Sequence, residues 1–408
     1  MARLSRRTLI LAPPVLVPLG LSLVLLLWAA CGDDGASTDS GVSGDSAIGD
    51  SASPNDSSSP TDTGTEADSA STDSATPPDA SRPPARDRLM YVSVGGEPRL
   101  AVVTLGADGT MTARSEFDLT LPANPGAMTY ARTARRLYLG VGGRLATVRL
   151  EDDGRPRISG FTPGVGNPVY VETANSEATV LTAYFGDDFL RSYDASGTPP
   201  HGEVDSAATA EEPHAARIGP SGLLYVPHRN GQTTDWYSVA AGGTLTRSGG
   251  LAAEAGAGPR HIAFSPDGSF AYVINEFTDS VSAHTIAADG SLTRMQTITT
   301  LPAGFDGDSN TCADVHVTPD GRFLYGSNRG HDSLAMFAIA EDGRLTGLGQ
   351  VATEARPREF DLSPDGRFVV AAGQDSGALQ SYRIEDDGTL TSVARLDVGA
   401  GLRWVIID

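Results

Sequence analysis

The sequence predicts an all-β fold, a seven-bladed β-propeller, because two kinds of tight turn alternate along most of the chain. The first kind is centred on a glycine, usually preceded by aspartate, and recurs roughly every 43 to 53 residues. The second kind reads Pro-Asp-Gly or Pro-Ser-Gly and falls between turns of the first kind. Two turns per repeat leave room for four short strands, which is one blade. The seven glycines of the first kind are Gly109, Gly154, Gly197, Gly243, Gly290, Gly343 and Gly388.

One repeat shows the four expected strands. Residues 260–265 form the innermost strand, and 270–274 form the second strand after a Pro-Asp-Gly turn. Residues 280–286 and 292–300 follow as the third and fourth strands. All four segments are rich in β-branched or aromatic residues and are bounded by Gly, Pro or Asp, which is typical of strands and not of helices.

The ends of this region indicate how the ring closes. Residues 88–92 resemble a second strand, whereas 402–408 resemble an innermost strand. We therefore expect the C-terminal strand to complete the first blade, which removes open sheet edges that would invite aggregation.

Three segments are expected: a signal peptide over 1–30, a disordered tether over 31–86 and the propeller over 87–408. Residues 1–30 have a basic start, an apolar run and two alanines directly before Cys31. This order predicts that Cys31 is lipidated and that the protein is an exported bacterial lipoprotein anchored to a membrane. The alternative is a plain transmembrane anchor, against which Pro13, Pro14 and Pro18 argue. The tether is Ser-, Thr-, Asp- and Pro-rich and cannot bury a core.

Charge and cysteine content narrow the classes of function. The formal net charge of −21 excludes a binder of the nucleic-acid backbone, because a polyanion would be repelled. Besides Cys31 only Cys312 is present, so the propeller holds no internal disulfide, and a buried inert thiol is expected. We expect a monomer that needs no cofactor and no metal ion.

Antiparallel pairing brings the start of each innermost strand and the end of each second strand to one face. The starts of innermost strands supply His214, Arg260, Arg358 and Arg403. Basic residues at one channel mouth are unexpected in so acidic a protein and indicate an anion site, although blade-to-blade ion pairs would explain them equally well. The ends of second strands supply His228, Arg229, Glu276, Arg329 and Gln374.

Segments 258–264, 273–276, 300–302 and 325–334 resemble the lactonase family of seven-bladed propellers, which includes 6-phosphogluconolactonases and carboxy-muconate lactonizing enzymes. The string Asn-Arg-Gly-His-Asp-Ser over 328–333 is the most specific part of the resemblance. The resemblance implies hydrolysis of a sugar lactone or a related small acidic lactone, with either Glu276 or His214 as the base. It implies the catalytic set His214, Arg260, Glu276 and Arg329. From their strand-end positions, we expect Arg358, Arg403, His228 and Gln374 to form the substrate wall.

Two departures from the family pattern leave other functions open. Glu212 stands where a second histidine is usual, and Pro227-His228-Arg229-Asn230 replaces the usual Pro-Asp-Leu-Gly. One alternative is a non-catalytic, envelope-anchored propeller that binds a small acid or a protein partner. Another is a metal-dependent gluconolactonase-like propeller, which seven repeats and the lack of a carboxylate-rich centre make less favourable.

Overall fold

The computed structural model describes residues 83–164, 166–305 and 309–408, all within the compact unit Ser71–Asp408. The expected signal peptide, Cys31 and nearly all of the expected tether lie outside the described residues. Residues 83–87 are exposed and have no regular secondary structure, and the first strand begins at Arg88. Within the described ranges, no helix is long and apolar enough to cross a membrane.

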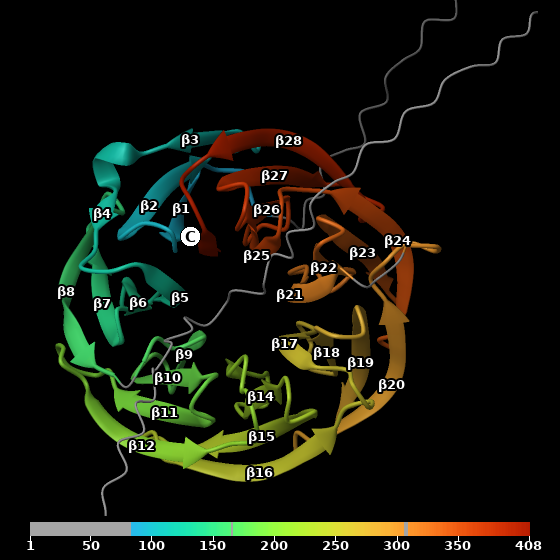
Figure 1. The fold of residues 1–408 in the computed structure, drawn as a ribbon, viewed down its shortest axis with the longest axis horizontal. Helices are drawn as coiled ribbons and strands as arrows, with labels where there is room; N and C mark the ends of the chain where they lie inside the picture. The colour runs from blue at the N-terminus through green and yellow to red at the C-terminus, as the bar shows by residue number, and fades with distance from the viewer. Residues whose placement is uncertain (1–82, 165, 306–308) are drawn as a thin grey trace, which may run out of the picture. The chain divides into compact units, whose positions relative to one another are not determined.

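Seven antiparallel sheets stand around a central axis, as predicted (Figure 1). The first blade consists of β29 (Leu402–Ile407), β1 (Arg88–Val94), β2 (Arg99–Leu105) and β3 (Met111–Ala113), with β4 (Leu119–Thr120) also paired to β2 and the short 3₁₀ helix η1 (Ser115–Phe117) between β3 and β4. The second blade consists of β5 (Pro125–Ala131), β6 (Arg136–Val141), β7 (Arg144–Leu150) and β8 (Pro156–Pro163). The third consists of β9 (Tyr170–Ala174), β10 (Thr179–Tyr184), β11 (Phe189–Asp194) and β12 (Gly202–Ala208).

The remaining four blades repeat the same plan, with strands numbered outward from the axis. The fourth blade consists of β13 (Arg217–Ile218), β14 (Leu224–His228), β15 (Thr233–Val239) and β16 (Leu245–Ala252). The fifth consists of β17 (Pro259–Phe264), β18 (Phe270–Asn275), β19 (Ser280–Ile286) and β20 (Leu292–Thr299). The sixth consists of β21 (Thr311–Val317), β22 (Phe323–Arg329), β23 (Ser333–Ile339) and β24 (Leu345–Ala352). The seventh consists of β25 (Pro357–Leu362), β26 (Phe368–Gly373), β27 (Ala378–Ile384) and β28 (Leu390–Asp397).

The predicted ring closure is confirmed. Strand β29 pairs antiparallel with β1, with Val92 opposite Val405 and Met90 opposite Ile407. The C-terminus consequently lies on the inner side of the first blade (Figure 1). Arg88 adds a hydrogen bond of 2.9 Å from Nη1 to the backbone oxygen of Asp408.

Neighbouring blades are joined by packed aliphatic side chains and by a repeated tyrosine contact. In four blades a tyrosine of the second strand donates its hydroxyl to the carbonyl of the glycine in the outer turn of the following blade. A buried hydroxyl needs such a partner, so the turn glycine and the tyrosine form one interlocking unit. The pairs are Tyr91 with Gly154, Tyr225 with Gly290, Tyr272 with Gly343, and Tyr325 with Gly388.

The third blade departs from the predicted turn pattern. Six of the seven predicted glycines adopt the left-handed backbone conformation that the turn requires, but Gly197 does not. Residues 195–201 instead form a longer connection between β11 and β12, in which the Pro199–Pro200 peptide bond is cis. The prediction of a tight glycine turn at Gly197 was therefore wrong, because two successive prolines follow it and fix a wider path.

Candidate functional site

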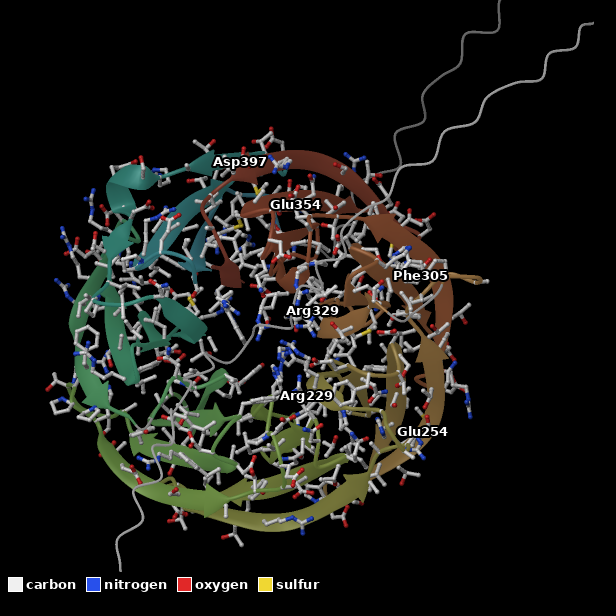
Figure 2. The ribbon with its side chains drawn as sticks, viewed as in Figure 1. Arg229, Glu254, Phe305, Arg329, Glu354 and Asp397 are labelled. Atoms are coloured by element: carbon white, nitrogen blue, oxygen red, sulfur yellow. The ribbon has the colours of Figure 1, made fainter. Side chains whose placement is uncertain are left out.

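One mouth of the channel is built from strand ends, as predicted. Pro259 at the start of β17 pairs with Asn275 at the end of β18, and Thr311 at the start of β21 pairs with Arg329 at the end of β22. Side chains that begin an innermost strand and side chains that end a second strand are therefore presented together. Figure 2 shows Arg229 and Arg329 beside the central axis, although they come from the fourth and sixth blades.

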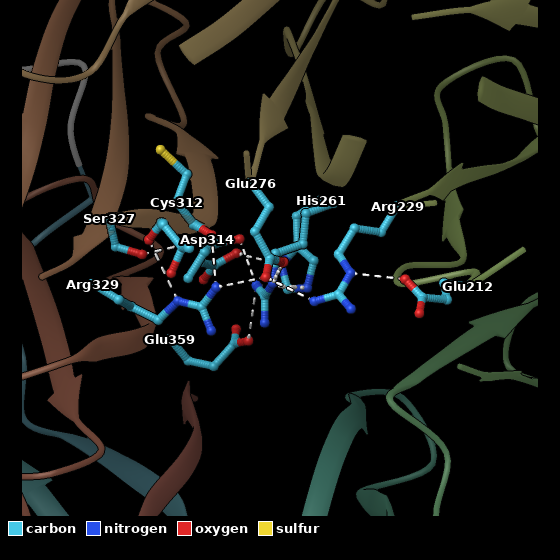
Figure 3. Close-up of polar contacts among 12 residues, drawn as sticks. Glu212, Arg229, His261, Glu276, Cys312, Asp314, Ser327, Arg329 and Glu359 are labelled. Atoms are coloured by element: carbon cyan, nitrogen blue, oxygen red, sulfur yellow. Dashed lines mark hydrogen bonds and ion pairs between the residues drawn. The ribbon is translucent and has the colours of Figure 1, made fainter. Parts of the chain in front are cut away.

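Three guanidinium groups converge on the buried carboxylate of Glu276 (Figure 3). Its Oε1 lies 2.9 Å from Nη1 of Arg229 and 3.1 Å from Nη2 of Arg329. Its Oε2 lies 3.2 Å from Nε of Arg260. Three of the four residues predicted as catalytic therefore form one ion cluster, which extends across three blades.

The pKa values in this cluster follow from burial and mutual charge. Burial alone would raise the pKa of Glu276, but the charges of Arg329, Arg260 and Arg229 outweigh it and hold the pKa below its usual value. Burial lowers the pKa of Arg260, and the neighbouring charge of Arg329 lowers it further. Glu276 is thus a carboxylate at neutral pH, and each of its two oxygens lies within 3.2 Å of an arginine nitrogen.

Arg260 is held from behind by a chain of hydrogen bonds. Its Nη1 donates to the backbone oxygen of Ala313 over 2.5 Å and lies 3.2 Å from Nε2 of His261. His261 Nδ1 lies 2.8 Å from Oδ1 of Asp314, and Oδ2 of Asp314 lies 2.9 Å from Nε2 of His316. Burial and the adjacent Arg260 lower the pKa of His261 to about 4. The neutral imidazole therefore donates from Nδ1 and accepts from Arg260 at Nε2.

His214, the fourth residue predicted as catalytic, lies beside this chain without a polar partner. Its ring centroid is 5.4 Å from that of His261 and 5.4 Å from that of Phe185. Its Nδ1 is buried and makes no hydrogen bond to any described residue. Burial, followed by the charge of Arg260, lowers its pKa well below the usual value. The imidazole is therefore neutral and has an unused nitrogen.

Two of the four predicted substrate-wall residues also reach the mouth. Burial lowers the pKa of Arg358, and Arg260, Arg329 and Arg403 lower it further. The negative charge of the neighbouring Glu359 opposes this lowering of the pKa but does not cancel it. The stem of Arg403 lies over Gly95, where a methyl group would approach its Cγ to 2.2 Å. The result is a crowded set of positive charges in an acidic protein.

The other two predicted substrate-wall residues do not join this cluster. His228 is fully buried, and its Nε2 lies 3.8 Å from Oδ2 of Asp235 within the fourth blade. Successive side chains of a strand point to opposite faces. Because Arg229 points toward Glu276, the preceding His228 points away from Glu276. Gln374 has a buried Oε1 without a hydrogen-bond partner and makes no described contact with Glu276 or its arginines. Neither side chain therefore contacts the Glu276 cluster, and a place for them on the substrate wall stays a prediction.

Sequence reasoning missed several members of the site. Arg229 stood among the strand-end residues but was not chosen, and its strand position next to His228 was the available signal. Asp314 and Glu359 lie in innermost strands without any motif that sets them apart. Burial, and then the negative charge of Asp314, raises the pKa of Glu359 well above its usual value.

A metal ion would find one set of ligand atoms among the described residues. His261, Asp314 and Glu359 each present an atom within 4.8 Å of the others. Both ring nitrogens of His261 are already hydrogen-bonded, so an ion would have to displace either Arg260 from Nε2 or Asp314 from Nδ1. Asp314 and Glu359 also line a cavity of about 240 Å³, whose other lining residues include Tyr170, Glu172, Arg217, His316, Asp361 and Trp404.

Comparison with known proteins gives consistent matches for the propeller. A family model described as "Lactonase, 7-bladed beta-propeller" matches residues 96–406. The 6-phosphogluconolactonase of Pectobacterium carotovorum subsp. carotovorum is 33% identical over 283 residues, which cover 67% of this chain and 84% of the relative. That of Yersinia pestis is 32% identical over 284 residues, covering 67% of this chain and 83% of the relative.

Solved structures agree on the architecture. A protein from Lactobacillus plantarum superimposes with a TM-score of 0.72 at 25% identity, covering 79% of this chain and 99% of that one. The periplasmic gluconolactonase of Pseudomonas aeruginosa superimposes with a TM-score of 0.71 at 24% identity, covering 79% of this chain and 99% of the other. At that identity the second likeness shows the fold alone.

Proposed function

The chain belongs to the seven-bladed β-propeller lactonase family, and on that basis we propose that its arginine-lined mouth hydrolyses a sugar lactone or a related small acidic lactone. The observation that carries this proposal is the crowding of Arg358 against Arg260, Arg329 and Arg403, whose charges lower its pKa although the carboxylate of Glu359 opposes them. Like charges held together in a folded protein cost free energy, and a bound anion offsets that cost. A carboxylate or phosphate group on the substrate would supply the anion.

We propose His214 as the general base. Its imidazole is neutral and has a free nitrogen, whereas each carboxylate oxygen of Glu276 already faces a guanidinium. His214 would take a proton from water as the water oxygen adds to the lactone carbonyl carbon. The ring C–O bond then breaks, the leaving oxygen takes up a proton, and a hydroxy acid results. Arg260 and Arg329 would stabilise the developing oxyanion, with Glu276 holding both in place.

Kinetics of two variants test this assignment. His214→Gln is expected to lower kcat by roughly 10² to 10⁴ because a positioned base contributes that much. Glu276→Gln leaves Arg229, Arg260 and Arg329 without their shared carboxylate and is expected to raise KM as well as lower kcat. A panel of neutral, carboxylated and phosphorylated lactones would be assayed. Full activity of His214→Gln would overturn the assignment of the base, and no turnover of any lactone would overturn the enzymatic proposal.

The three arginine contacts to Glu276 also support a second candidate function, a non-catalytic propeller that binds a small acid or a protein partner. Arg229 uses two of its nitrogens on Glu212 and Glu276, so part of the positive charge at the mouth is neutralised internally. Saturable binding of gluconate by calorimetry, without turnover of any lactone, would favour this candidate.

We further propose that the protein is an exported, monomeric lipoprotein held to a membrane through lipidated Cys31, and that it does not bind nucleic acid. The support is the order of basic, apolar and small residues before Cys31. Cys31→Ser is expected to move the protein from the membrane fraction to the soluble fraction. Cys312→Ser is the matched control, because that thiol is buried in the propeller. Retention of Cys31→Ser in the membrane fraction would contradict the anchor.

A further inference from the structure

An ion pair beside the candidate site connects it to the rim of the mouth. Nε of Arg229 donates to Oε2 of Glu212 over 2.9 Å, and Nη1 donates to Oε1 of Glu276 over 2.9 Å. The backbone N–H of Arg229 also donates to the backbone oxygen of Glu212 over 2.9 Å. In Figure 3, Glu212 lies on the far side of Arg229 from Glu276.

Two aromatic rings fix the position of the Arg229 guanidinium. Its central carbon lies 4.6 Å from the ring centroid of Phe185 and 5.3 Å from that of Phe277. Arginine over an aromatic face is favourable and restricts the side chain to one arrangement. Phe277 is 45% exposed, so this part of the rim is open to solvent and accessible to a ligand.

The two side chains of the pair have opposite electrostatic effects on the mouth. Glu212 and Arg229 are both about one-fifth exposed, with side-chain values of 21% each, so solvent screens them only partly. With Glu212 neutralised, Arg229, Arg260 and Arg329 would share the single negative charge of Glu276, and the net charge of the mouth would rise. With Arg229 neutralised, the carboxylates of Glu212 and Glu276 would remain, and the net charge of the mouth would fall.

We infer that Glu212 and Arg229 form a charge-setting pair that determines how strongly the mouth prefers anionic over neutral ligands. This inference rests on the proposed function, since it assumes that the ligand meets the arginines around Glu276. Glu212 weakens the affinity for anions and Arg229 strengthens it, so the two residues together set the affinity at an intermediate value. Both are specificity-determining residues, because they act on the charge of the ligand and not on the reacting atoms.

A purely structural role would make a different prediction. Arg229 joins the fourth blade to Glu276 in the fifth, so it could serve only to hold these blades together. In that case, removal of either partner of the ion pair would impair binding of anionic and neutral ligands alike. Opposite signs for the two single variants therefore distinguish charge setting from structural support.

The experiment measures binding of D-gluconate and of its uncharged analogue D-glucitol by isothermal titration calorimetry at low ionic strength. Glu212→Gln is expected to tighten gluconate binding roughly three- to tenfold, and Arg229→Gln to weaken it by a similar factor, as for one charge near a partly exposed site. The double variant Glu212→Gln/Arg229→Gln is expected to return close to the original affinity. Binding of D-glucitol is expected to stay unchanged throughout, and the gluconate effects to shrink as salt is added.

Controls separate charge from folding. Arg229→Lys keeps the charge but loses the paired hydrogen bonds, and it is expected to restore most of the gluconate affinity. Glu116→Gln removes one negative charge from the exposed Arg114–Glu116 pair on the first blade. It is expected to leave the affinities for gluconate and glucitol unchanged. Melting temperatures of all variants report whether the fold is intact.

The outcomes are distinct from those that test the enzymatic proposal. Changes of the same sign in both single variants, equal effects on gluconate and glucitol, or no gluconate binding by the unmodified protein would overturn the inference. Opposite signs in a protein that hydrolyses no lactone would support the inference and overturn the enzymatic proposal. For an active enzyme, KM for an anionic lactone is expected to follow the gluconate affinity across the variants.

Discussion

His261 of the fifth blade donates from Nδ1 to Oδ1 of Asp314 in the sixth blade across 2.8 Å. Both residues are almost fully buried, at 3% exposure each. This contact orients the imidazole so that its other nitrogen lies 3.2 Å from Nη1 of Arg260. The position of the Arg260 guanidinium at the mouth therefore depends on the His261–Asp314 contact between the fifth and sixth blades.

We predict strong energetic coupling between His261 and Asp314. His261→Phe keeps the ring but loses the hydrogen bond, and Asp314→Asn removes the charge. Hydrogen bonds to charged groups contribute about 1.5 to 3 kcal/mol, so a double-mutant cycle by urea unfolding is expected to give a coupling free energy in that range. A coupling free energy near zero would show that the two side chains contribute independently.

Stability is predicted to fall as the pH falls below about 6.5, through buried neutral histidines. Burial lowers the pKa values of His228, His261 and His284 to about 4. Because these folded-state values lie below the unfolded value, the unfolded chain takes up protons first, and stability present above pH ~6.5 is lost as the pH falls toward ~4.

His284 isolates this effect, since it lies in β19 away from the mouth. Each such histidine adds a slope of about 1.4 kcal/mol per pH unit to the free energy of unfolding in that window. His284→Asn is expected to reduce the slope between pH 4.5 and 6 by about that amount. Chemical unfolding over a pH series measures it, and an unchanged slope would mean that His284 is protonated in the folded state.

The predicted turn glycines are expected to differ in their tolerance of a side chain. Gly222 and Gly290 both have a φ of +81°. A methyl group on Gly222 would meet nothing within 4 Å, whereas one on Gly290 would lie 2.3 Å from Cδ1 of Leu223. Gly222→Ala is expected to cost about 1 kcal/mol of backbone strain. Gly290→Ala is expected to cost at least about 1 kcal/mol more, because it also displaces Leu223.

The unfolding free energies of these two variants give the comparison directly. Equal losses would mean that Leu223 moves aside freely and that the turn contributes only its own backbone strain.

Ring closure by β29 predicts that truncation after Gly401 abolishes cooperative thermal unfolding. The truncation removes all main-chain pairing on the inner side of β1 and also the buried Val405 and Ile407. Circular dichroism and calorimetry report the loss. A synthetic peptide of residues 400–408 is expected to restore the transition. Retention of the full transition by the truncated chain would contradict this role of β29.

The sequence alone determined the number of blades, the strand order and the closure by residues 402–408. These features follow from local chemistry, since glycine turns and β-branched runs are specified residue by residue. The alternation of strands also placed Arg260, Glu276 and Arg329 at one mouth. The exception at Gly197 has a local cause as well, because Pro199 and Pro200 follow it.

The tertiary structure decided which of these charges meet. Glu276 binds three arginines from three blades, and Glu212 binds Arg229. His228 lies against Asp235 within its own blade. These contacts join strands that are many residues apart in the chain, and each depends on the rotamers that packing around the channel allows. No local pattern carries that information, because the energy of a charge depends on every group that surrounds it after folding.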